Sequence, residues 1–116
     1  MKQQQNSEED CSPMLCILFR AKAKPGKRQE LIDFLMWDYQ ECKEEAETLR
    51  FDVWVDPADE DAVFVYEAYQ DQAAFEKHME GKPFQQWSSE VEPEWISEKW
   101  TLFAGEPLCL LSGRED

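Results

Sequence analysis

The side chains with the clearest capacity for chemistry in this 116-residue sequence are Glu67, Tyr69 and His78, the last being the single histidine. Glu67 and Tyr69 are two residues apart, so on a strand they point to the same face of a sheet. A carboxylate within so apolar a run needs a partner or a function. It can fix the tautomer of an imidazole and raise its basicity, so Glu67 and His78 together could remove a proton from a phenol, quinol or enol.

Nearby aromatic residues could complete such a site. Tyr66 and Tyr69 could donate hydrogen bonds to an oxyanion. Four further rings could hold a flat substrate: Trp54, Phe75, Phe84 and Trp87. A structural interpretation stays open, because a buried histidine paired with a glutamate often only holds a helix to a sheet, and aromatic residues often only fill a core.

The elements that would position these residues follow from their periodicity. Residues 49–56 alternate between apolar and polar side chains, as a half-buried strand does. A proline and three acids at 57–61 predict an exposed turn, and a second strand follows at 63–69. Asp71 can cap the next helix, which carries Ala74, Phe75, His78 and Met79 on one side and ends near Gly81.

The rest of the chain predicts a strand over 14–24, ended by Pro25 and Gly26, and a helix over about 27–47. The apolar stripe expected on this helix consists of Leu31, Leu35, Tyr39, Cys42 and Ala46. A short helical piece begins at Lys82 and is interrupted by Pro93, and a fourth strand covers 100–105. Residues 1–13 are expected to form a mobile acidic tail and residues 108–116 a C-terminal extension.

The predicted order is strand, helix, strand, strand, helix, strand. This order is typical of the ferredoxin-like α+β fold, in which two helices cover one face of a four-stranded antiparallel sheet. Both faces of the predicted strands carry large apolar residues, among them Trp54, Phe64, Tyr66 and Phe103. Because the helices cover only one face, we expect a second subunit on the other and hence a homodimer.

Composition excludes several classes of partner. The chain has 26 acidic and 12 basic residues, a formal net charge of −14. Such a surface repels phosphate backbones and anionic lipid, so neither nucleic acid nor a membrane is expected as a partner. No apolar run approaches the ~20 residues of a membrane helix. The first residues lack the pattern of a secretory signal, which favours the cytoplasm. The scattered cysteines predict no metal site.

Four segments together resemble the antibiotic biosynthesis monooxygenase family. They are LRFDV at 49–53, FVYEAY at 64–69, D-x-x-A-F-x-x-H at 71–78 and KPF at 82–84. The resemblance covers about residues 14–103, within a domain expected over 14–107, and implies a dimeric α+β barrel. It implies an enzyme that needs no cofactor and acts on a small quinol, phenol or enol, whose anion reacts with dioxygen. His78, Glu67 and Tyr69 would then be catalytic, and Trp54, Tyr66, Phe75, Phe84 and Trp87 would contact the substrate.

Other branches of this family define the alternatives. The 49–53 and 64–69 strings are most similar to the isomerase of a phosphorylated autoinducer-2 signal, which implies isomerisation of an enolisable carbonyl compound. The haem-degrading branch carries an asparagine where Phe19 stands and a histidine in the last helical piece, where this chain has Phe84 and Ser88. A non-catalytic dimeric binding or stress module is a third possibility. A cavity of ~300 Å³ or more beside Glu67, Tyr69 and His78 would favour an enzyme.

Overall fold

The computed structural model describes residues 14–110 and contains the predicted succession of elements. The strands are β1 (Leu15–Ala23), β2 (Thr48–Val55), β3 (Ala62–Tyr69) and β4 (Ile96–Gly105). The helices are α1 (Arg28–Cys42), α2 (Gln72–Met79), α3 (Lys82–Gln86) and a π-helix, η3 (Trp87–Trp95). The predicted tail at 1–13 and the end of the extension, 111–116, lie outside the described residues.

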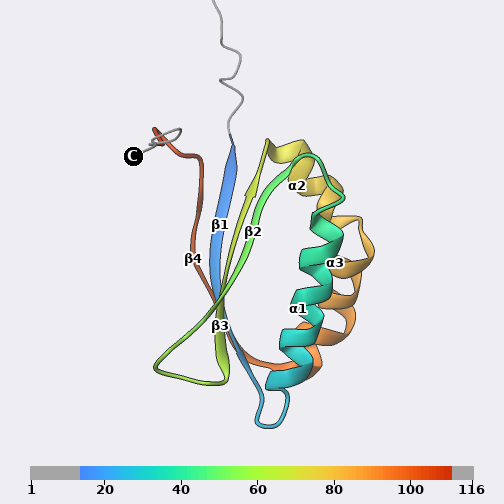
Figure 1. The fold of residues 1–116 in the computed structure, drawn as a ribbon, viewed down its shortest axis with the longest axis vertical. Helices are drawn as coiled ribbons and strands as arrows, with labels where there is room; N and C mark the ends of the chain where they lie inside the picture. Colours follow the sequence, from blue (N-terminus) through green and yellow to red (C-terminus); the bar gives the residue numbers. More distant parts are fainter. Residues whose placement is uncertain (1–13, 111–116) are drawn as a thin grey trace, which may run out of the picture.

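The four strands form one antiparallel sheet in the order β2-β3-β1-β4. All helices lie on one face of this sheet, while its opposite face carries none, as Figure 1 shows. This is the predicted ferredoxin-like α+β fold. Within residues 14–110, no helix is long and apolar enough to cross a membrane.

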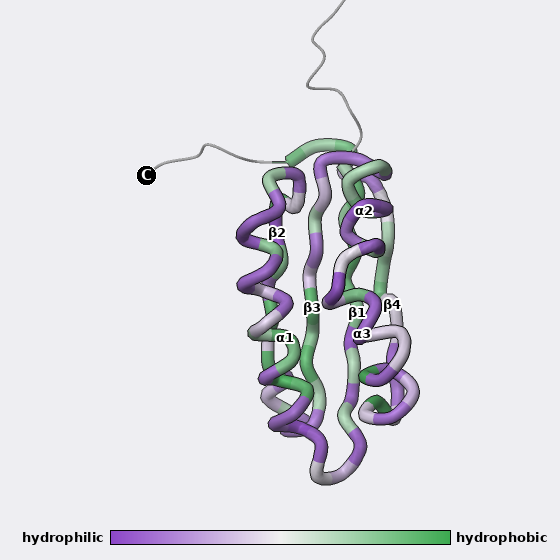
Figure 2. Tube along the Cα trace, turned by 90° about the vertical axis from the view of Figure 1, so that its right-hand side faces the viewer, coloured by the Kyte–Doolittle hydropathy of each residue, from purple (hydrophilic) through white to green (hydrophobic). Residues whose placement is uncertain are grey.

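Alternation along the strands assigns each side chain to one of two environments. On β3, Val63, Val65 and Tyr69 are buried under the helices, whereas Phe64 and Tyr66 between them are half-buried on the open face. The buried core joins β1, α1, β2, β3 and η3 and includes Phe19, Leu31, Phe34, Val65 and Val91. The tube in Figure 2 shows the same division on α1, where hydrophilic and hydrophobic residues alternate along the helix.

Helix α1 differs from its prediction in length and in its buried stripe. It ends at Cys42 instead of near residue 47, and the chain then turns into β2 through hydrogen bonds such as Glu45 N–H to the Cys42 carbonyl. The buried stripe includes Phe34 and Asp38, while Tyr39 is 38% exposed. The predicted stripe was therefore wrong at Tyr39, because the buried face of α1 runs through Phe34 and Asp38 instead.

The segment after α2 also differs from the prediction. Pro93 does not interrupt the helical piece but lies inside η3, where the wide turn tolerates its missing N–H. Helix α2 ends at Met79, close to the predicted Gly81, and Gly81 has φ of −78° and serves as the N-cap of α3. Asp71 caps α2 as predicted, with its Oδ1 accepting from the Ala74 N–H at 2.9 Å.

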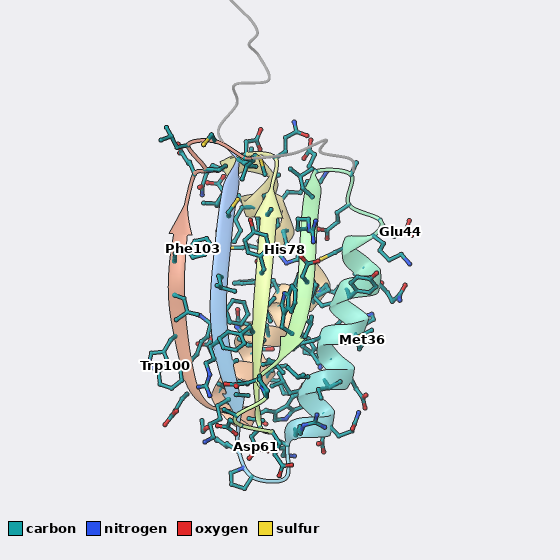
Figure 3. All side chains as sticks on the ribbon, turned by 60° about the vertical axis from the view of Figure 1, so that its left-hand side comes forward. Met36, Glu44, Asp61, His78, Trp100 and Phe103 are labelled. Atoms are coloured by element: carbon teal, nitrogen blue, oxygen red, sulfur yellow. The ribbon has the colours of Figure 1, made fainter. Side chains whose placement is uncertain are left out.

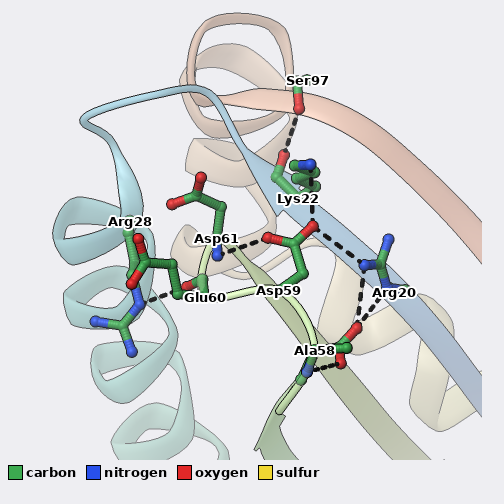
Figure 4. A network of polar contacts seen from close by, with 9 residues as sticks. Arg20, Lys22, Arg28, Ala58, Asp59, Glu60, Asp61 and Ser97 are labelled. Atoms are coloured by element: carbon green, nitrogen blue, oxygen red, sulfur yellow. Dashed lines mark hydrogen bonds and ion pairs between the residues drawn. The ribbon is translucent and has the colours of Figure 1, made fainter.

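An ion-pair network holds the predicted acidic turn against β1, at the lower end of the sheet in Figure 1 (Figure 4). Arg20 binds Asp56 at 3.0 Å and Asp59 at 3.5 Å, and Lys22 binds Asp59 at 2.9 Å. The hydrogen bond from Lys22 lowers the pKa of Asp59. The network fixes the β2–β3 connection at the end of the sheet far from His78, so these acids are structural.

Candidate active site

A cavity of about 410 Å³ lies between the sheet and the helices. Its volume falls within the range of small-molecule sites. Most of its lining is apolar, and a few ionisable side chains reach into it. The lining residues are Leu15, Ile17, Phe19, Leu35, Asp38, Phe51, Glu67, Phe75, His78, Phe84, Trp87, Glu92, Lys99, Thr101 and Ala104.

Four elements bring carboxylates and the imidazole to this cavity, and Glu92 comes from η3. Strand β3 carries Glu67 on its helix-facing side, in phase with Val65 and Tyr69. Helix α2 places His78 on its buried face, four residues after Ala74. His78 is 5% exposed and lines the cavity. Helix α1 contributes Asp38, three residues after Leu35 and on the same face.

Glu67 and Tyr69 form a hydrogen-bonded pair on β3. The Tyr69 hydroxyl donates to Glu67 Oε1 at 2.6 Å. Burial raises the pKa of Glu67, and the hydrogen bond from Tyr69 opposes this rise. Burial, together with the neighbouring Glu67, also raises the pKa of Tyr69 far above its ordinary value. Tyr69 is therefore a permanent donor, and Glu67 is a carboxyl group held in a poorly solvated place.

His78 is paired with Glu45 and not, as the sequence analysis expected, with Glu67. His78 Nδ1 lies 3.0 Å from Glu45 Oε1. Among residues 14–110, no hydrogen bond joins Glu67 to His78, although both line the cavity. The charge of His78 only opposes the rise in the pKa of Glu67 that burial causes. Glu67 instead has a hydrogen-bond donor on its own strand, because the Tyr69 hydroxyl binds its carboxyl group.

Asp38 is the residue of this site that sequence reasoning missed. It is 6% exposed, and its one side-chain hydrogen bond among the described residues comes from Cys42 Sγ at 3.5 Å. Burial raises its pKa to about 6, and the charge of His78 opposes that rise. A carboxyl group with this pKa can both accept and donate a proton near neutral pH. Its spacing of three residues from Leu35 and four from Cys42 is the signal that places it on the buried face of α1.

Asp38, Cys42 and His78 each offer one potential ligand atom, and these atoms lie within 4.8 Å of one another. Such donors suit a transition metal such as zinc, provided that the thiol loses its proton. Burial raises the pKa of the Cys42 thiol far above its ordinary value, and its proton lies in the hydrogen bond to Asp38. The three side chains therefore form a buried polar network.

The five aromatic residues predicted to contact substrate divide between two faces of the sheet. Phe75, Phe84 and Trp87 line the cavity. Trp54 and Tyr66 instead line a shallow hollow on the open face, and Trp54 is 60% exposed. Their place in the predicted site was therefore wrong. The reason is the strand period of two, because Tyr66 adjoins Glu67 on β3 and must point the opposite way.

Strand β4 adds two polar residues that the sequence analysis did not assign to the site, Lys99 and Thr101. The Lys99 ammonium lies 5.1 Å from the centre of the Phe19 ring. The pairing with β1 shifts between Leu18 and Phe19, so that Thr101 pairs with Phe19 but Phe103 pairs with Leu18. This bulge lets Thr101 and Ala104 both line the cavity, which simple alternation forbids.

The fold and this cavity define a class of protein: an α+β domain with a cavity between its sheet and its helices into which ionisable side chains reach. The sequence identifies the family within that class. Residues 14–90 match the antibiotic biosynthesis monooxygenase family, and the chain belongs to this family. No curated protein matches the sequence.

Solved structures share the fold. A protein from Shewanella oneidensis superimposes with a TM-score of 0.76 at 22% identity, covering 83% of this chain and 92% of its own. A protein from Pseudomonas aeruginosa gives a TM-score of 0.75 at 23% identity, covering 84% and 97%. A protein from Mycobacterium tuberculosis gives 0.76 at 16% identity, covering 85% and 99%. At these identities the likeness extends to the fold alone.

Proposed function

We propose that this protein is a monooxygenase that removes a proton from a small quinol, phenol or enol and lets the resulting anion react with dioxygen. The observation that carries the proposal is the cavity of about 410 Å³ in which Asp38, Glu67 and His78 meet a mostly apolar lining. Membership of the monooxygenase family supports the same reaction class. A cavity filled by its own aromatic residues would have favoured the non-catalytic module.

In the proposed reaction, His78 accepts the proton of the substrate and becomes an imidazolium ion. The electron pair of the broken bond stays on the substrate as an enolate or phenolate. For an activated CH₂ group, the anion and dioxygen form a peroxide that takes up the imidazolium proton and then loses water to leave a carbonyl group, so both oxygen atoms and both hydrogen atoms are accounted for. The carboxyl groups of Glu67 and Asp38 line the cavity beside His78, and Phe75, Phe84 and Trp87 hold the ring. Tyr69 is fully buried and holds the Glu67 carboxyl group through its hydrogen bond.

The test is oxygen uptake by the purified protein with a panel of anthrones and quinols and no added cofactor. We expect turnover of at least one compound and a loss of about 10²–10⁴-fold in the His78→Ala variant, the usual effect of removing a positioned base. Melting curves on the same samples separate a loss of catalysis from a loss of folding. A folded His78→Ala protein with full activity would remove His78 from the mechanism.

One observation favours a second candidate, an isomerase of a small enolisable carbonyl compound. Asp38, whose pKa is about 6, lies with a carboxylate oxygen within 4.8 Å of an imidazole nitrogen of His78. One group could thus remove a proton and the other could return one to a neighbouring atom, which is what keto–enol isomerisation requires. Deuterium exchange into a carbonyl substrate without oxygen uptake would favour this candidate over the monooxygenase.

We further expect a homodimer that buries the open face of the sheet. Among the described residues, this face carries several exposed apolar side chains, including Trp54, Val55, Trp100 and Phe103. Figure 3 shows Trp100 and Phe103 along β4, at the sheet edge away from α1. Apolar surface of this extent is typical of an interface. Strand faces of two copies would then meet and exclude water from it.

A further inference from the structure

We propose that Glu45 is the positioning residue of His78: it fixes which ring nitrogen carries the proton and leaves the other nitrogen as the acceptor. The inference rests on the proposed function, because it assigns a helper to the base of that reaction. The assigned tautomer can nevertheless be measured without any substrate, so the two ideas can fail separately.

Glu45 is held in place before it meets the imidazole. It lies in the turn between α1 and β2, and its Oε1 accepts a hydrogen bond from the Thr48 hydroxyl at 2.7 Å. The Thr48 backbone N–H donates to the Glu45 carbonyl at 3.0 Å. The same Oε1 lies 3.0 Å from His78 Nδ1. Because a carboxylate only accepts, Nδ1 carries the proton in this contact and the second nitrogen has a free lone pair.

His78 forms part of the wall between the cavity and a second hollow on the outside of the protein. This acidic groove is lined by Glu44, Glu45, Ala46, Glu47, Thr48, Ala74, Lys77, His78, Glu80 and Gly81. His78 lines both spaces, whereas Glu45 lines only the groove. The His78 side chain is 4% exposed and that of Glu45 is 31% exposed. The pair therefore connects a buried base to a partner at the solvent boundary.

This arrangement gives Glu45 two separable effects on proton removal. Its hydrogen bond keeps the proton on Nδ1, so that the second nitrogen can accept the substrate proton. Its negative charge then stabilises the imidazolium ion that forms when the bond to the substrate proton breaks. Glutamine at this position keeps an oxygen that can accept from Nδ1 but removes the charge, whereas alanine removes both.

The first experiment is nitrogen-15 NMR of the full-length protein with labelled histidine, in which His78 gives the only imidazole signals. Above the pH at which the ring loses its charge, we expect the Nδ1–H tautomer in the native protein and in Glu45→Gln. We expect Glu45→Ala to lose this preference. Glu44→Ala is the matched control, because Glu44 lines the same groove and carries the same charge but makes no hydrogen bond to His78.

The second experiment measures turnover of the same variants with a compound found by oxygen uptake. We expect Glu45→Ala to lower kcat by about tenfold or more, with KM little changed, and Glu45→Gln to retain part of the loss because the charge is gone. Glu44→Ala should behave like the native protein.

An unchanged tautomer in Glu45→Ala, or a lost tautomer with unchanged kcat, would overturn the inference. If Glu45→Ala does not fold, Glu45→Gln decides: its kcat must fall for the inference to stand. A correct tautomer without turnover of any compound would instead overturn the proposed function.

Discussion

At the scale of single residues, the buried carboxyl group of Asp38 is the most informative feature of the site. It lines the cavity and has only a thiol as its side-chain partner among the described residues. Four neighbouring ionisable groups influence the pKa of Asp38: His78, Glu67, Cys42 and Glu45. A buried carboxyl group of this kind lowers the stability of the folded protein. Residues that lower stability in this way are common at functional sites.

The Asp38→Asn variant should be more stable than the native protein near neutral pH. Burial raises the Asp38 pKa from 3.8 to about 6, so ionised Asp38 destabilises the folded state above pH 6, and this cost disappears below about pH 4. The difference corresponds to at most ~3 kcal/mol. We expect a melting temperature several degrees higher at pH 7.5 and equal at pH 4, together with lower turnover. Equal melting at both pH values would show that Asp38 is solvated.

Tyr69→Phe tests the hydrogen bond between Tyr69 and Glu67. The change removes the 2.6 Å hydrogen bond to Glu67 and leaves that carboxyl group buried without a donor. We expect a loss of ~1–3 kcal/mol in the free energy of unfolding, measured by urea denaturation. Tyr66→Phe is the control, because it removes a hydroxyl group from the neighbouring residue on the open face. An equal loss in both variants would contradict the assigned role of Tyr69.

The sequence predicted which residues lie at the site better than it predicted their hydrogen-bond partners. Glu67 and His78 were found because each interrupts an apolar pattern. Their supposed pairing was wrong because the true partners, Tyr69 and Glu45, depend on side-chain reach and on a turn whose path the sequence does not define. The catalytic roles of Glu67, Tyr69 and His78 stay predictions.

At the scale of elements, periodicity predicted every strand and most of the helical segments, because local patterns record which face is buried. Boundaries were less well predicted. Helix α1 ends about five residues earlier than expected, and β4 begins at Ile96 instead of Trp100. The bulge between β1 and β4 could not be predicted, since it arises from pairing between strands that are far apart in the sequence.

The cap of α2 gives a test at this scale, because α2 carries His78. Asp71→Ala should lower the free energy of unfolding by ~1 kcal/mol, since the Ala74 N–H loses its acceptor. Asp71→Asn should lose little, because asparagine keeps an oxygen in the same place. Thermal melts of both variants measure the difference. If asparagine were as damaging as alanine, the charge and not the cap would be responsible.

At the scale of the whole molecule, the open face of the sheet should decide the oligomeric state. Phe103 on this face and Met36 on α1 are both 47% exposed in the single chain, so they form a matched pair. We expect sedimentation to show a native dimer, with Phe103→Glu shifted towards monomer and Met36→Glu unchanged. A stable interface would bury more than ~1,000 Å² in total. A monodisperse native monomer at micromolar concentration would contradict this prediction.

The alternation of β3 has a consequence for how this protein can diversify. Odd-numbered residues from Val63 to Tyr69 belong to the core and the cavity, and the even-numbered Phe64 and Tyr66 belong to the open face. Substitutions can therefore change the reaction and the choice of partner independently, although both are encoded in the same eight residues. An insertion or deletion of one residue within β3 cannot do so, because it would exchange the two sets of side chains. We expect relatives of this chain to vary β3 by substitution and to keep its length constant.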